Sequence, residues 1–509
     1  MTTFAWLLHA EWTKFRTVRG WVAAVLVAVL ATIGLGLVSN SSCSTNGGGC
    51  PAAPAGPDGE AVQDAFSFAH QPLTGSGTIT VRLTALSVRL PPGVALRSQS
   101  SPTLSSRQLP WSKAGIIIKA NTAQGSAYAA MMVTSGHGVR MQWDFTHDAP
   151  GLAGAATGSS PRWLRLARTG DTITGYDSAD GATWYRIGAV TLPRLPLTVQ
   201  AGLFAASPFY MHIISAGIGG ESTDTMPTEA TGSFDHIGLS WSGSTWTSDQ
   251  VGGQGPFGPG TAGAVRLTGS AGTVTGSGDI APVIANPDSA DGGIGIKDTL
   301  VGTFAGMLVL IVLAAMFITA EYRRGLIRLT LAASTSRVRA LAAKAAVVGA
   351  IGFVAGAVAI AIAIPAGISK LHANGNPVLP VPALTEVRLV IGSGLLIGVA
   401  AVLALGIGTA VRRSAVAVAA VIAIVFVPYL IATVPGLLPF AAQNWLLRVT
   451  PAAGFAVQQA YPRYYQVDAM YRAVDGYYPL APWAGLAVEC AWAVAALLLA
   501  GYLLRRRDV

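Results

Sequence analysis

The sequence predicts a multi-domain membrane protein, an α-helical bundle of six transmembrane helices with an all-β sandwich inserted between the first and second helices. One apolar span, Trp21–Val38, is followed by a polar stretch that continues to Lys297, and five further apolar spans come after it. A helix needs about 20 apolar residues to cross a bilayer. The mean hydropathy of +0.51 and the 11% share of charged residues are too apolar for an ordinary soluble protein.

The basic balance of the chain fits a membrane better than a nucleic acid. The net charge is +9. No basic stripe interleaved with aromatic residues is present, so no nucleic-acid partner is expected. Membrane proteins place Lys and Arg beside the cytoplasmic ends of their spans. We therefore expect membrane lipid as the partner of these charges.

The first span predicts the orientation of the chain. Lys14, Arg16 and Arg19 precede it, and residues 39–50 beyond it carry no basic residue. This asymmetry places the N-terminus in the cytoplasm. No small-residue cleavage pattern follows the span, so it is expected to be an anchor and not a removed signal peptide.

The remaining spans agree with this orientation. They are expected at Thr299–Ala320, Ala345–Ile368, Leu389–Val411, Ala415–Val434 and Trp483–Leu504. Alternation makes residues 321–344, 412–413 and the tail 505–507 cytoplasmic, and these segments are rich in Arg and Lys. The sequence thus predicts a multi-pass protein of the cell membrane with both termini cytoplasmic and the large domain extracytoplasmic.

The inserted domain has the periodicity of β-strands. Apolar residues alternate in Thr78–Leu83, Val139–Phe145 and Trp163–Arg168, and turn sequences lie at Thr169–Asp171 and Ser178–Gly181. Short alternating runs separated by turns are typical of an antiparallel sandwich.

Part of this domain has a recognisable pattern. Trp163–Phe204, with its Gly170-Asp171 hairpin and its Asp180-to-Trp184 run, resembles the concanavalin-A-like (laminin-G-like) jelly-roll domains. Phe234–Ile237 resembles the closing strand of that fold. The resemblance covers roughly Phe66–Trp241 and implies a jelly-roll sandwich, with little information on function.

The sandwich is not expected to be a hydrolase. Glycoside hydrolysis needs two carboxyl groups that flank the scissile bond. Jelly-roll glucanases carry them as Glu-x-Asp-x-x-Glu, and no such run occurs. Asp144 and Asp148 are the nearest candidates, and Asp148 is expected to begin a loop. Trp143, Trp163 and Trp184 are candidates for stacking on a glycan or cell-wall ligand, with packing in the core as the commoner alternative.

The domain boundaries follow from these patterns. We expect the interfacial helix and first span at 1–40, a linker at 41–65, the sandwich at 66–250, a Gly-rich tether at 251–297 and the other spans at 298–509. Cys43 and Cys50 flank a Gly-rich turn where an extracytoplasmic disulfide is permitted. The alternative is two free thiols in a flexible linker, and no metal site is expected there.

The residues that border the first two spans form a recognisable combination. Glu11–Arg16 precedes the first span, where Phe4, Leu8, Trp12 and Phe15 form one stripe of an interfacial helix. Glu321-Tyr322-Arg323-Arg324-Gly325 ends the second span. Together they resemble permease subunits of the type-two ABC exporter family, in which a Glu-x-Arg-x-Gly run precedes a short cytoplasmic helix that docks on the ATPase.

The resemblance implies specific coupling residues. The run corresponds to Glu321, Arg323 and Gly325, and the docking helix to about Ile327–Leu341. The ATPase-coupling residues are expected to be Glu321, Arg323, Arg324, Gly325, Arg337 and Arg339. The inserted sandwich departs from the short first outer loop of ordinary relatives, so no substrate is inferred from them. The alternative is a basic loop that only sets topology.

The expected function is that of a non-catalytic permease subunit of a bacterial ABC exporter. The sequence contains no Gly-x-x-x-x-Gly-Lys-Ser/Thr phosphate loop, so ATP must be hydrolysed by a separate ATPase subunit. A homodimer or heterodimer of permeases is expected, and no cofactor. The alternative function is a membrane-anchored carbohydrate-binding or sensor protein whose working part is the sandwich.

Two features of the later spans complete the predictions. Gly352 and Gly356 in one span, and Gly394 and Gly398 in the next, are small residues spaced for close helix packing. Glu489 lies within the last span, where a carboxyl group is unfavourable unless it faces water or a partner. It is a candidate for the transport path, with snorkelling to the outer interface as the alternative.

Overall fold

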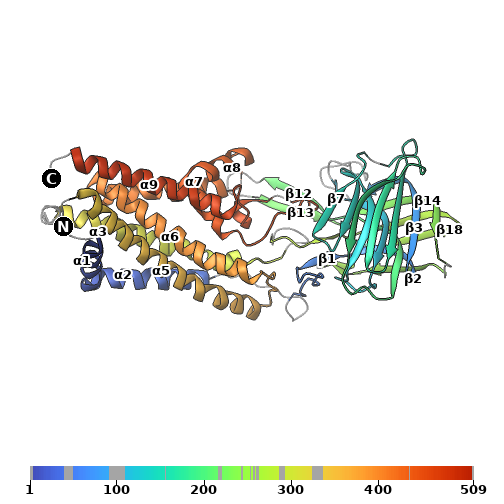
Figure 1. Ribbon diagram of the computed structural model, residues 1–509, viewed down its shortest axis with the longest axis horizontal. Coiled ribbons are helices and arrows are strands. Elements are labelled where there is room, and N and C mark those ends of the chain that lie inside the picture. Colours follow the sequence, from blue (N-terminus) through green and yellow to red (C-terminus); the bar gives the residue numbers. More distant parts are fainter. Residues whose placement is uncertain are drawn as a thin grey trace.

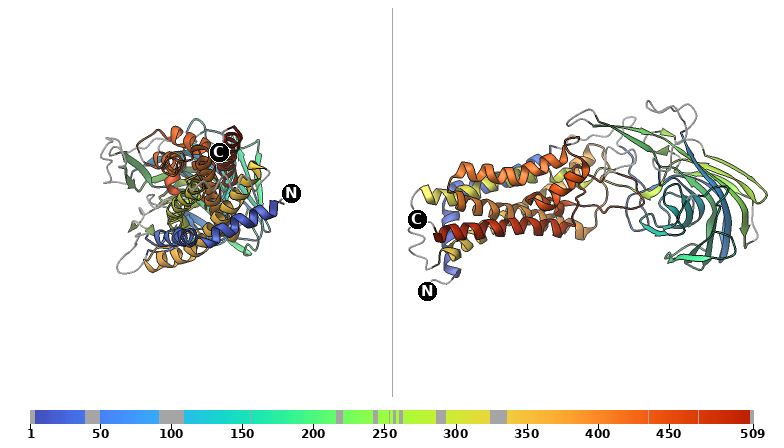
Figure 2. Two further views of the ribbon diagram at one scale, coloured as in Figure 1. Left: turned by 90° about the vertical axis from the view of Figure 1, so that its left-hand side faces the viewer. Right: turned by 90° about the horizontal axis from the view of Figure 1, so that it is seen from above.

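The protein is elongated, with a helical bundle at one end and a β-sandwich at the other. The computed structural model describes residues 4–38, 50–90, 109–154, 156–215, 221–241, 245–252, 254–255, 258–259, 263–285, 293–323, 336–434, 436–469 and 471–506. Figure 1 shows both termini at the end of the bundle that is far from the sandwich, and Figure 2 shows the same arrangement from two further directions. In the following, this is called the terminal end of the bundle, and the opposite end is its sandwich end.

Among the described residues, six helices are long and apolar enough to cross a membrane, and each of the six predicted spans falls on one of them. They are α2 (Arg19–Gly36), α3 (Thr303–Arg323), α5 (Arg337–Ala373), α6 (Ala383–Val411), α7 (Ser414–Thr433) and α9 (Pro482–Arg506). The short helix η1 (Ile296–Leu300) leads into α3, and η3 (Ala473–Asp475) lies in the loop before α9. The membrane-protein prediction is confirmed at this level of composition and length.

The helix α1 (Phe4–Thr17) lies across the terminal end of the bundle, at an angle to the spanning helices (Figures 1 and 2). The side chains of the predicted stripe differ in their exposure. Phe15 is buried at 4% exposure, whereas Phe4 and Trp12 are 43% and 47% exposed. The carboxyl-bearing Glu11 is buried instead. The side of α1 that meets the bundle is therefore partly polar.

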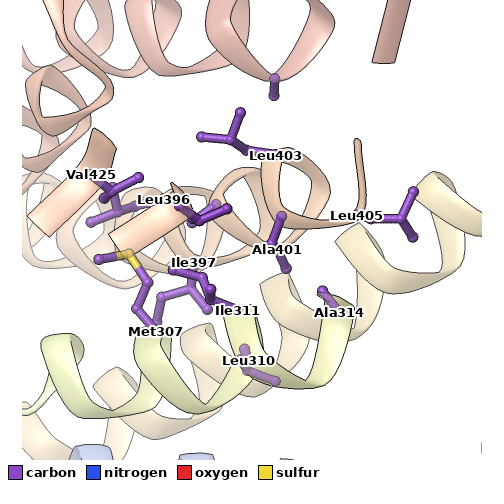
Figure 3. Close-up of a cluster of buried hydrophobic side chains, with 14 of the residues drawn as sticks. Met307, Leu310, Ile311, Ala314, Leu396, Ile397, Ala401, Leu403, Leu405 and Val425 are labelled. Atoms are coloured by element: carbon purple, nitrogen blue, oxygen red, sulfur yellow. The ribbon is translucent and has the colours of Figure 1, made fainter. Parts of the chain in front are cut away.

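The core of the bundle lies between α3 and α6. Figure 3 shows Met307, Leu310, Ile311 and Ala314 of α3 facing Leu396, Ile397 and Ala401 of α6, with Val425 of α7 beside them. All of these side chains are buried. Because α6 contacts α3, α5, α7 and α9, it is the central helix of the bundle.

The helices α5 and α6 cross with their backbones in contact. A Cβ atom added to Gly352 would lie 3.0 Å from the Cα of Gly398, and one added to Gly356 would lie 3.1 Å from the Cα of Gly394. The absence of side chains at these four positions permits this approach. The predicted glycine pairs therefore face each other across one helix crossing.

All named strands of the described residues fall between α2 and α3. Most belong to two antiparallel seven-stranded sheets, with the orders β10-β9-β8-β3-β14-β19-β18 (the first sheet) and β15-β2-β11-β4-β5-β6-β7 (the second sheet). The strands are β1 (Val62–Asp64), β2 (Phe66–Thr74), β3 (Gly77–Arg89), β4 (Lys113–Lys119), β5 (Tyr128–Thr134), β6 (Gly138–Trp143), β7 (His147–Pro150), β8 (Arg162–Thr169), β9 (Thr172–Ser178), β10 (Tyr185–Thr191), β11 (Thr198–Ala206), β12 (Tyr210–Ser215), β13 (Glu221–Met226), β14 (Glu229–Leu239), β15 (Thr247–Val251), β16 (Gln254–Gly255), β17 (Gly258–Pro259), β18 (Ala264–Thr268), β19 (Ala271–Gly276) and β20 (Ile280–Pro282). The main core lies between the two sheets, as the alternation predicts.

Two details of the sandwich differ from the expectations. Asp144 and Phe145 do not continue β6 but form a turn, with φ angles of 42° and 59°. Asp148 does not begin a loop but lies in β7, where its backbone is the partner of Gln142 in β6. Its carboxylate accepts a hydrogen bond from the guanidinium of Arg140. The predicted turn at Gly170, with a φ of 61°, joins β8 to β9 as expected.

The segment expected as a Gly-rich tether contributes to the sandwich. Strands β18 and β19, which lie within residues 251–297, extend the first sheet beside β14. Val274 of β19 is fully buried in the core between the sheets. The short Gly- and Thr-rich strands carry few apolar residues, which is why the sequence resembles a linker.

A short neck of two paired strands, β1 and β20, leads from the sandwich toward the bundle. Two buried lysines of β4 hold it. The Nζ of Lys119 lies 2.6 Å from Asp64, and the Nζ of Lys113 lies 2.7 Å from Asp279. These chain segments cover the second sheet on the face away from the core, with Val62, Ile280 and Phe66 at 0% exposure.

The loop before α9 also meets the sandwich. The side-chain amide of Gln466 donates to the carbonyl of Phe145 over 2.8 Å, and the Tyr465 hydroxyl lies 3.3 Å from Nδ1 of His137. Arg140 lies over the rings of both Tyr465 and Trp111. The sandwich is thus attached to the bundle through this loop as well as through the neck.

Candidate functional site

Four charged side chains meet at the terminal end of the bundle and form what is called here the charge cluster: Glu11, Lys14, Glu321 and Lys344. The Nζ of Lys344 lies 2.8 Å from Glu11 Oε2 and 2.7 Å from Glu321 Oε1. The Nζ of Lys14 lies 2.9 Å from Glu11 Oε1 and 3.4 Å from Glu321 Oε1. Two carboxylates and two ammonium groups balance in charge.

Three elements supply the charge cluster. Glu11 and Lys14 come from α1, Glu321 from the last turn of α3, and Lys344 from the beginning of α5. The side chains of Glu11, Glu321 and Lys344 are 5%, 10% and 3% exposed. A movement of one of the three elements away from the others would leave a buried charge without its counter-charge, which is energetically unfavourable. The ion pairs therefore favour one arrangement of the three elements.

Aromatic rings pack beside these charges. The ring of Phe317 on α3 lies 6.0 Å from Phe15 and 5.9 Å from Trp21 between centroids. The Nζ of Lys344 lies 5.5 Å from the Phe317 ring, within the range of a cation–π contact. The corner between α1 and α2 is therefore fixed to α3 by apolar packing as well as by ion pairs.

The predicted coupling residues separate into two groups. Glu321 is 8% exposed and faces Lys344, so its carboxylate is held inside the protein. Arg323 and Arg339 are exposed, and Arg337 is half-buried. Arg324 and Gly325 lie outside the described residues. The carboxylate of Glu321 is thus held inside the chain, whereas the side chains of Arg323 and Arg339 reach its surface, and the coupling role of all of these residues stays a prediction.

The end of α9 is joined to the same region. Arg337, at the beginning of α5, donates from Nη1 to the carbonyl of Leu504 over 2.5 Å. The guanidinium of Arg412, after α6, lies 5.2 Å from the ring of Tyr322. The described part of the predicted docking helix, residues 337–341, is continuous with α5 and not a separate helix.

The sequence did not predict Glu11, Lys14 and Lys344 as site residues. Glu11 and Lys344 lie 333 positions apart, and no periodicity links them. One signal was present, because an acidic residue at the end of an apolar span needs a buried counter-charge. Lys344, the last charge before the third span, could have been matched to Glu321 on that argument.

Glu489 lies in a different part of the bundle. It is 0% exposed on α9 and packs against the 3₁₀ helix η2 (Pro451–Gln458), which follows α8 (Phe440–Val449). A Cβ atom added to Gly454 of η2 would lie 2.3 Å from Glu489 Oε2. Full burial excludes the snorkelling alternative for Glu489.

The three tryptophans proposed for glycan stacking do not form one surface. Trp143 packs against the core between the sheets and stacks on His147 at 5.1 Å. Trp163 and Trp184 belong to the first sheet and the turn beside it. The guanidinium of Arg165 lies 3.7 Å from the centre of the Trp184 ring and occupies one of its faces. Glycan stacking stays a prediction, restricted to the ring faces that remain free.

The turn between β9 and β10 is organised by Asp180. Its carboxylate accepts hydrogen bonds from the backbone N–H groups of Thr183 (2.8 Å) and Ala182 (2.9 Å) and from the Ser178 hydroxyl (2.9 Å). The indole of Trp184 donates to the carbonyl of Gly181 over 3.0 Å. These bonds to the charged form, led by that of Thr183, lower the pKa of Asp180 to about 2.

This turn predicts a pH dependence. A carboxyl group with a lowered pKa stabilises the fold above its unfolded pKa of about 3.9, and this contribution disappears as the pH falls toward 2. Asp180→Ala should therefore lower the melting temperature of the sandwich at neutral pH and cease to matter near pH 2. Melting curves across acid pH, with Asp171→Ala as the exposed control, measure this. A pH-independent difference would contradict the assignment.

Other candidate chemistry is limited in the described part of the chain. There, no group of three or more His, Cys, Asp or Glu residues is placed to hold a metal ion. Cys50 is disulfide-bonded and Cys490 is a free thiol. Cys43 lies outside the described residues, so the predicted pairing with Cys50 stays a prediction.

Comparisons with known proteins do not assign a family. No family model matches the chain, and no characterised protein sequence does. A functionally unknown protein from Saccharomyces cerevisiae is 14% identical, with 40% of this chain and 92% of that one covered and a TM-score of 0.20. A scytalido-glutamic peptidase with a transition state analog inhibitor is 10% identical, with 42% of this chain and 98% of that one covered and a TM-score of 0.24. A lectin from Bauhinia forficata in complex with GalNAc is 11% identical, with 36% of this chain and 90% of that one covered and a TM-score of 0.19.

Proposed function

We propose that this chain is the membrane-spanning permease subunit of an ABC exporter, and that a separate ATPase subunit hydrolyses the ATP. The observation that carries the proposal is the charge cluster, which fastens α1 to α3 and α5 at the terminal end of the bundle. A permease needs a rigid element at that end, because force from a soluble partner must reach the spanning helices. Two copies of the chain, or this chain and a second permease, would pair with two ATPase subunits.

The packing of the bundle gives a route for such a force. A displacement of the end of α3 and the beginning of α5 moves α1 with them through Glu321, Lys344 and Glu11. The backbone of α5 is in contact with α6 at Gly352 and Gly398, so α6 follows. Because α6 lies at the centre of the bundle, the remaining helices must repack when it moves.

The same proposal assigns the two sides of the membrane. The terminal end of the bundle is cytoplasmic, and the sandwich lies outside the cell. The support is the Lys and Arg bias: Arg323, Arg339, Arg413, Arg505 and Arg506 lie at the terminal end.

Impermeant thiol labelling tests the sidedness. In a chain with Cys490→Ser, a cysteine at the exposed Ala179 should react in intact cells, and one at the exposed Arg413 should react only after the cells are opened. The Cys490→Ser chain without an added cysteine measures the background labelling of Cys43 and Cys50. The reverse labelling pattern would contradict the orientation.

Two arginines at the beginning of α5, the half-buried Arg337 and the exposed Arg339, test the coupling. Arg337→Glu plus Arg339→Glu should leave the bundle in the membrane but reduce co-purification with the ATPase at least tenfold. Because Arg337 also donates to the carbonyl of Leu504, its replacement could weaken the contact between α5 and α9. The single change Arg339→Glu leaves that hydrogen bond in place and therefore reports on the binding of the ATPase alone. The matched control is Arg413→Glu plus Arg505→Glu, a double reversal at the same end. If the coupling pair binds the ATPase as well as the control does, these arginines do not couple the subunits.

A further inference from the structure

Glu489 is a buried carboxyl group without a partner. It lies about 10 Å along α9 from the beginning of the helix, at the rise of 1.5 Å per residue, and it is 0% exposed. Within the described chain, neither of its carboxyl oxygens has a hydrogen-bond partner. A carboxylate in this position would lack both water and a counter-charge.

The short helix η2 closes the site. Every residue of η2 is buried. Gly454 lies directly on the carboxyl group, and a Cβ atom added to Gly485 of α9 would lie 2.2 Å from the carbonyl of Ala453. Side chains larger than hydrogen at these two glycines would separate η2 from α9. The contact therefore depends on both positions.

The opposite end of η2 is satisfied by polar partners. The side-chain amide of Gln458 donates to the hydroxyls of Thr303 on α3 and Ser393 on α6, over 3.0 Å and 3.1 Å. The rings of Phe304 and Phe455 stack at 4.7 Å beside them. η2 is thus seated among α3, α6 and α9, and Glu489 is the one member of this polar set, among the residues described, that lacks a partner.

No described charge faces Glu489 from the elements packed against it. Helix η2 has no titratable side chain, the Arg448 side chain of α8 is exposed, and the charged residues of α5 lie toward its two ends. On α6, the titratable groups are Glu386 and Arg388 near its beginning, and Arg388 is bound to the carbonyl of Gln459. The nearest titratable neighbour on α9 is the thiol of Cys490. A neutral carboxylic acid is the form that this environment accommodates.

We propose that Glu489 is a proton-binding site, occupied while η2 is docked on α9 and emptied when η2 moves away. The step is the association of one proton with the carboxylate, and the proton is exchanged with water at the sandwich end of the bundle. The export cycle would thereby take up and release a proton outside the cell. The site itself does not depend on the proposed function, because it can be measured in this chain without an ATPase.

Infrared spectroscopy tests the protonation directly. The full chain in lipid nanodiscs is compared with Glu489→Gln, which keeps the size and neutrality of the protonated acid. The difference spectrum should show the C=O stretch of a carboxylic acid, and the band should persist at mildly alkaline pH, where exposed glutamates are ionised. Glu489→Gln should melt at the wild-type temperature. Carboxylate bands in place of the acid band, or a strongly destabilised Glu489→Gln, would overturn the proposal and favour pairing with a cationic substrate.

A glycine variant tests the link to η2. Gly454→Ala places a methyl group 2.3 Å from Glu489 Oε2, which is closer than two such atoms can approach, and should displace η2. The acid band should then be lost at mildly alkaline pH. The control is Gly34→Ala in α2, where an added Cβ would meet nothing within 4 Å. An acid band in Gly454→Ala that persists as in the wild type would show that docking of η2 does not govern the proton.

Discussion

Lys344→Met is expected to destabilise the folded bundle by about 3–5 kcal/mol, the range observed when one partner of a buried ion pair is removed. The change leaves the two buried carboxylates of Glu11 and Glu321 with the half-exposed Lys14 as the one remaining counter-charge of the charge cluster. Methionine preserves the length and apolar volume of the lysine stem, so the loss of charge is isolated. Thermal unfolding of the full chain in detergent is the measurement.

Two comparisons make this result specific. Lys14→Met should cost at most about 1 kcal/mol, because exposed ion pairs contribute little and the Lys14 side chain is 42% exposed. Adding Glu11→Gln and Glu321→Gln to Lys344→Met should restore much of the lost stability, since no buried charge is then unpaired. If Lys344→Met melts at the wild-type temperature, the charge cluster does not hold the three helices together.

Gly398→Val is the second change with a large expected effect, about 3 kcal/mol, at the upper end of the usual range for overpacking. A Cβ atom at Gly398 would lie 2.8 Å from the carbonyl oxygen of Gly349 and 3.1 Å from the amide nitrogen of Phe353. These are backbone atoms of α5, so the contact cannot be relieved by a side-chain rotation.

The matched control for this helix crossing is Gly34→Val in α2, where the added side chain has open space. The two variants carry the same change in helix propensity, so their difference reports the crossing between α5 and α6. Thermal unfolding should distinguish them clearly. Equal melting temperatures would mean that α5 and α6 do not approach as closely as described.

The spanning helices could be predicted because their signal is local. A long apolar run and its flanking charges are contained in one stretch of sequence, so all six predicted spans fall on helices. The glycines at positions 352, 356, 394 and 398 were also recognisable from their spacing. The sequence did not specify that Gly352 meets Gly398 and Gly356 meets Gly394, because that depends on how α5 and α6 cross.

The charge cluster and the edge of the sandwich were harder to predict, since both depend on distant parts of the chain. Lys344 is bound by Glu11, and neither residue has a local partner that reveals the other. Strand β19 is Gly- and Thr-rich and gains its apolar environment from β14, so its own sequence resembles a linker. Asp148 appeared to begin a loop because the bond to Arg140 that holds it in β7 is formed across the hairpin.

Co-purification with an ATPase tests the central claim most directly. The chain should be expressed with an ATPase subunit that contains a phosphate loop and is encoded beside its gene. We predict a stable complex with equal numbers of the two subunits, and ATP hydrolysis that changes when the complex is placed in lipid. A chain that purifies without any ATPase, and leaves the hydrolysis rate of the ATPase unchanged, would contradict the assignment as a permease subunit.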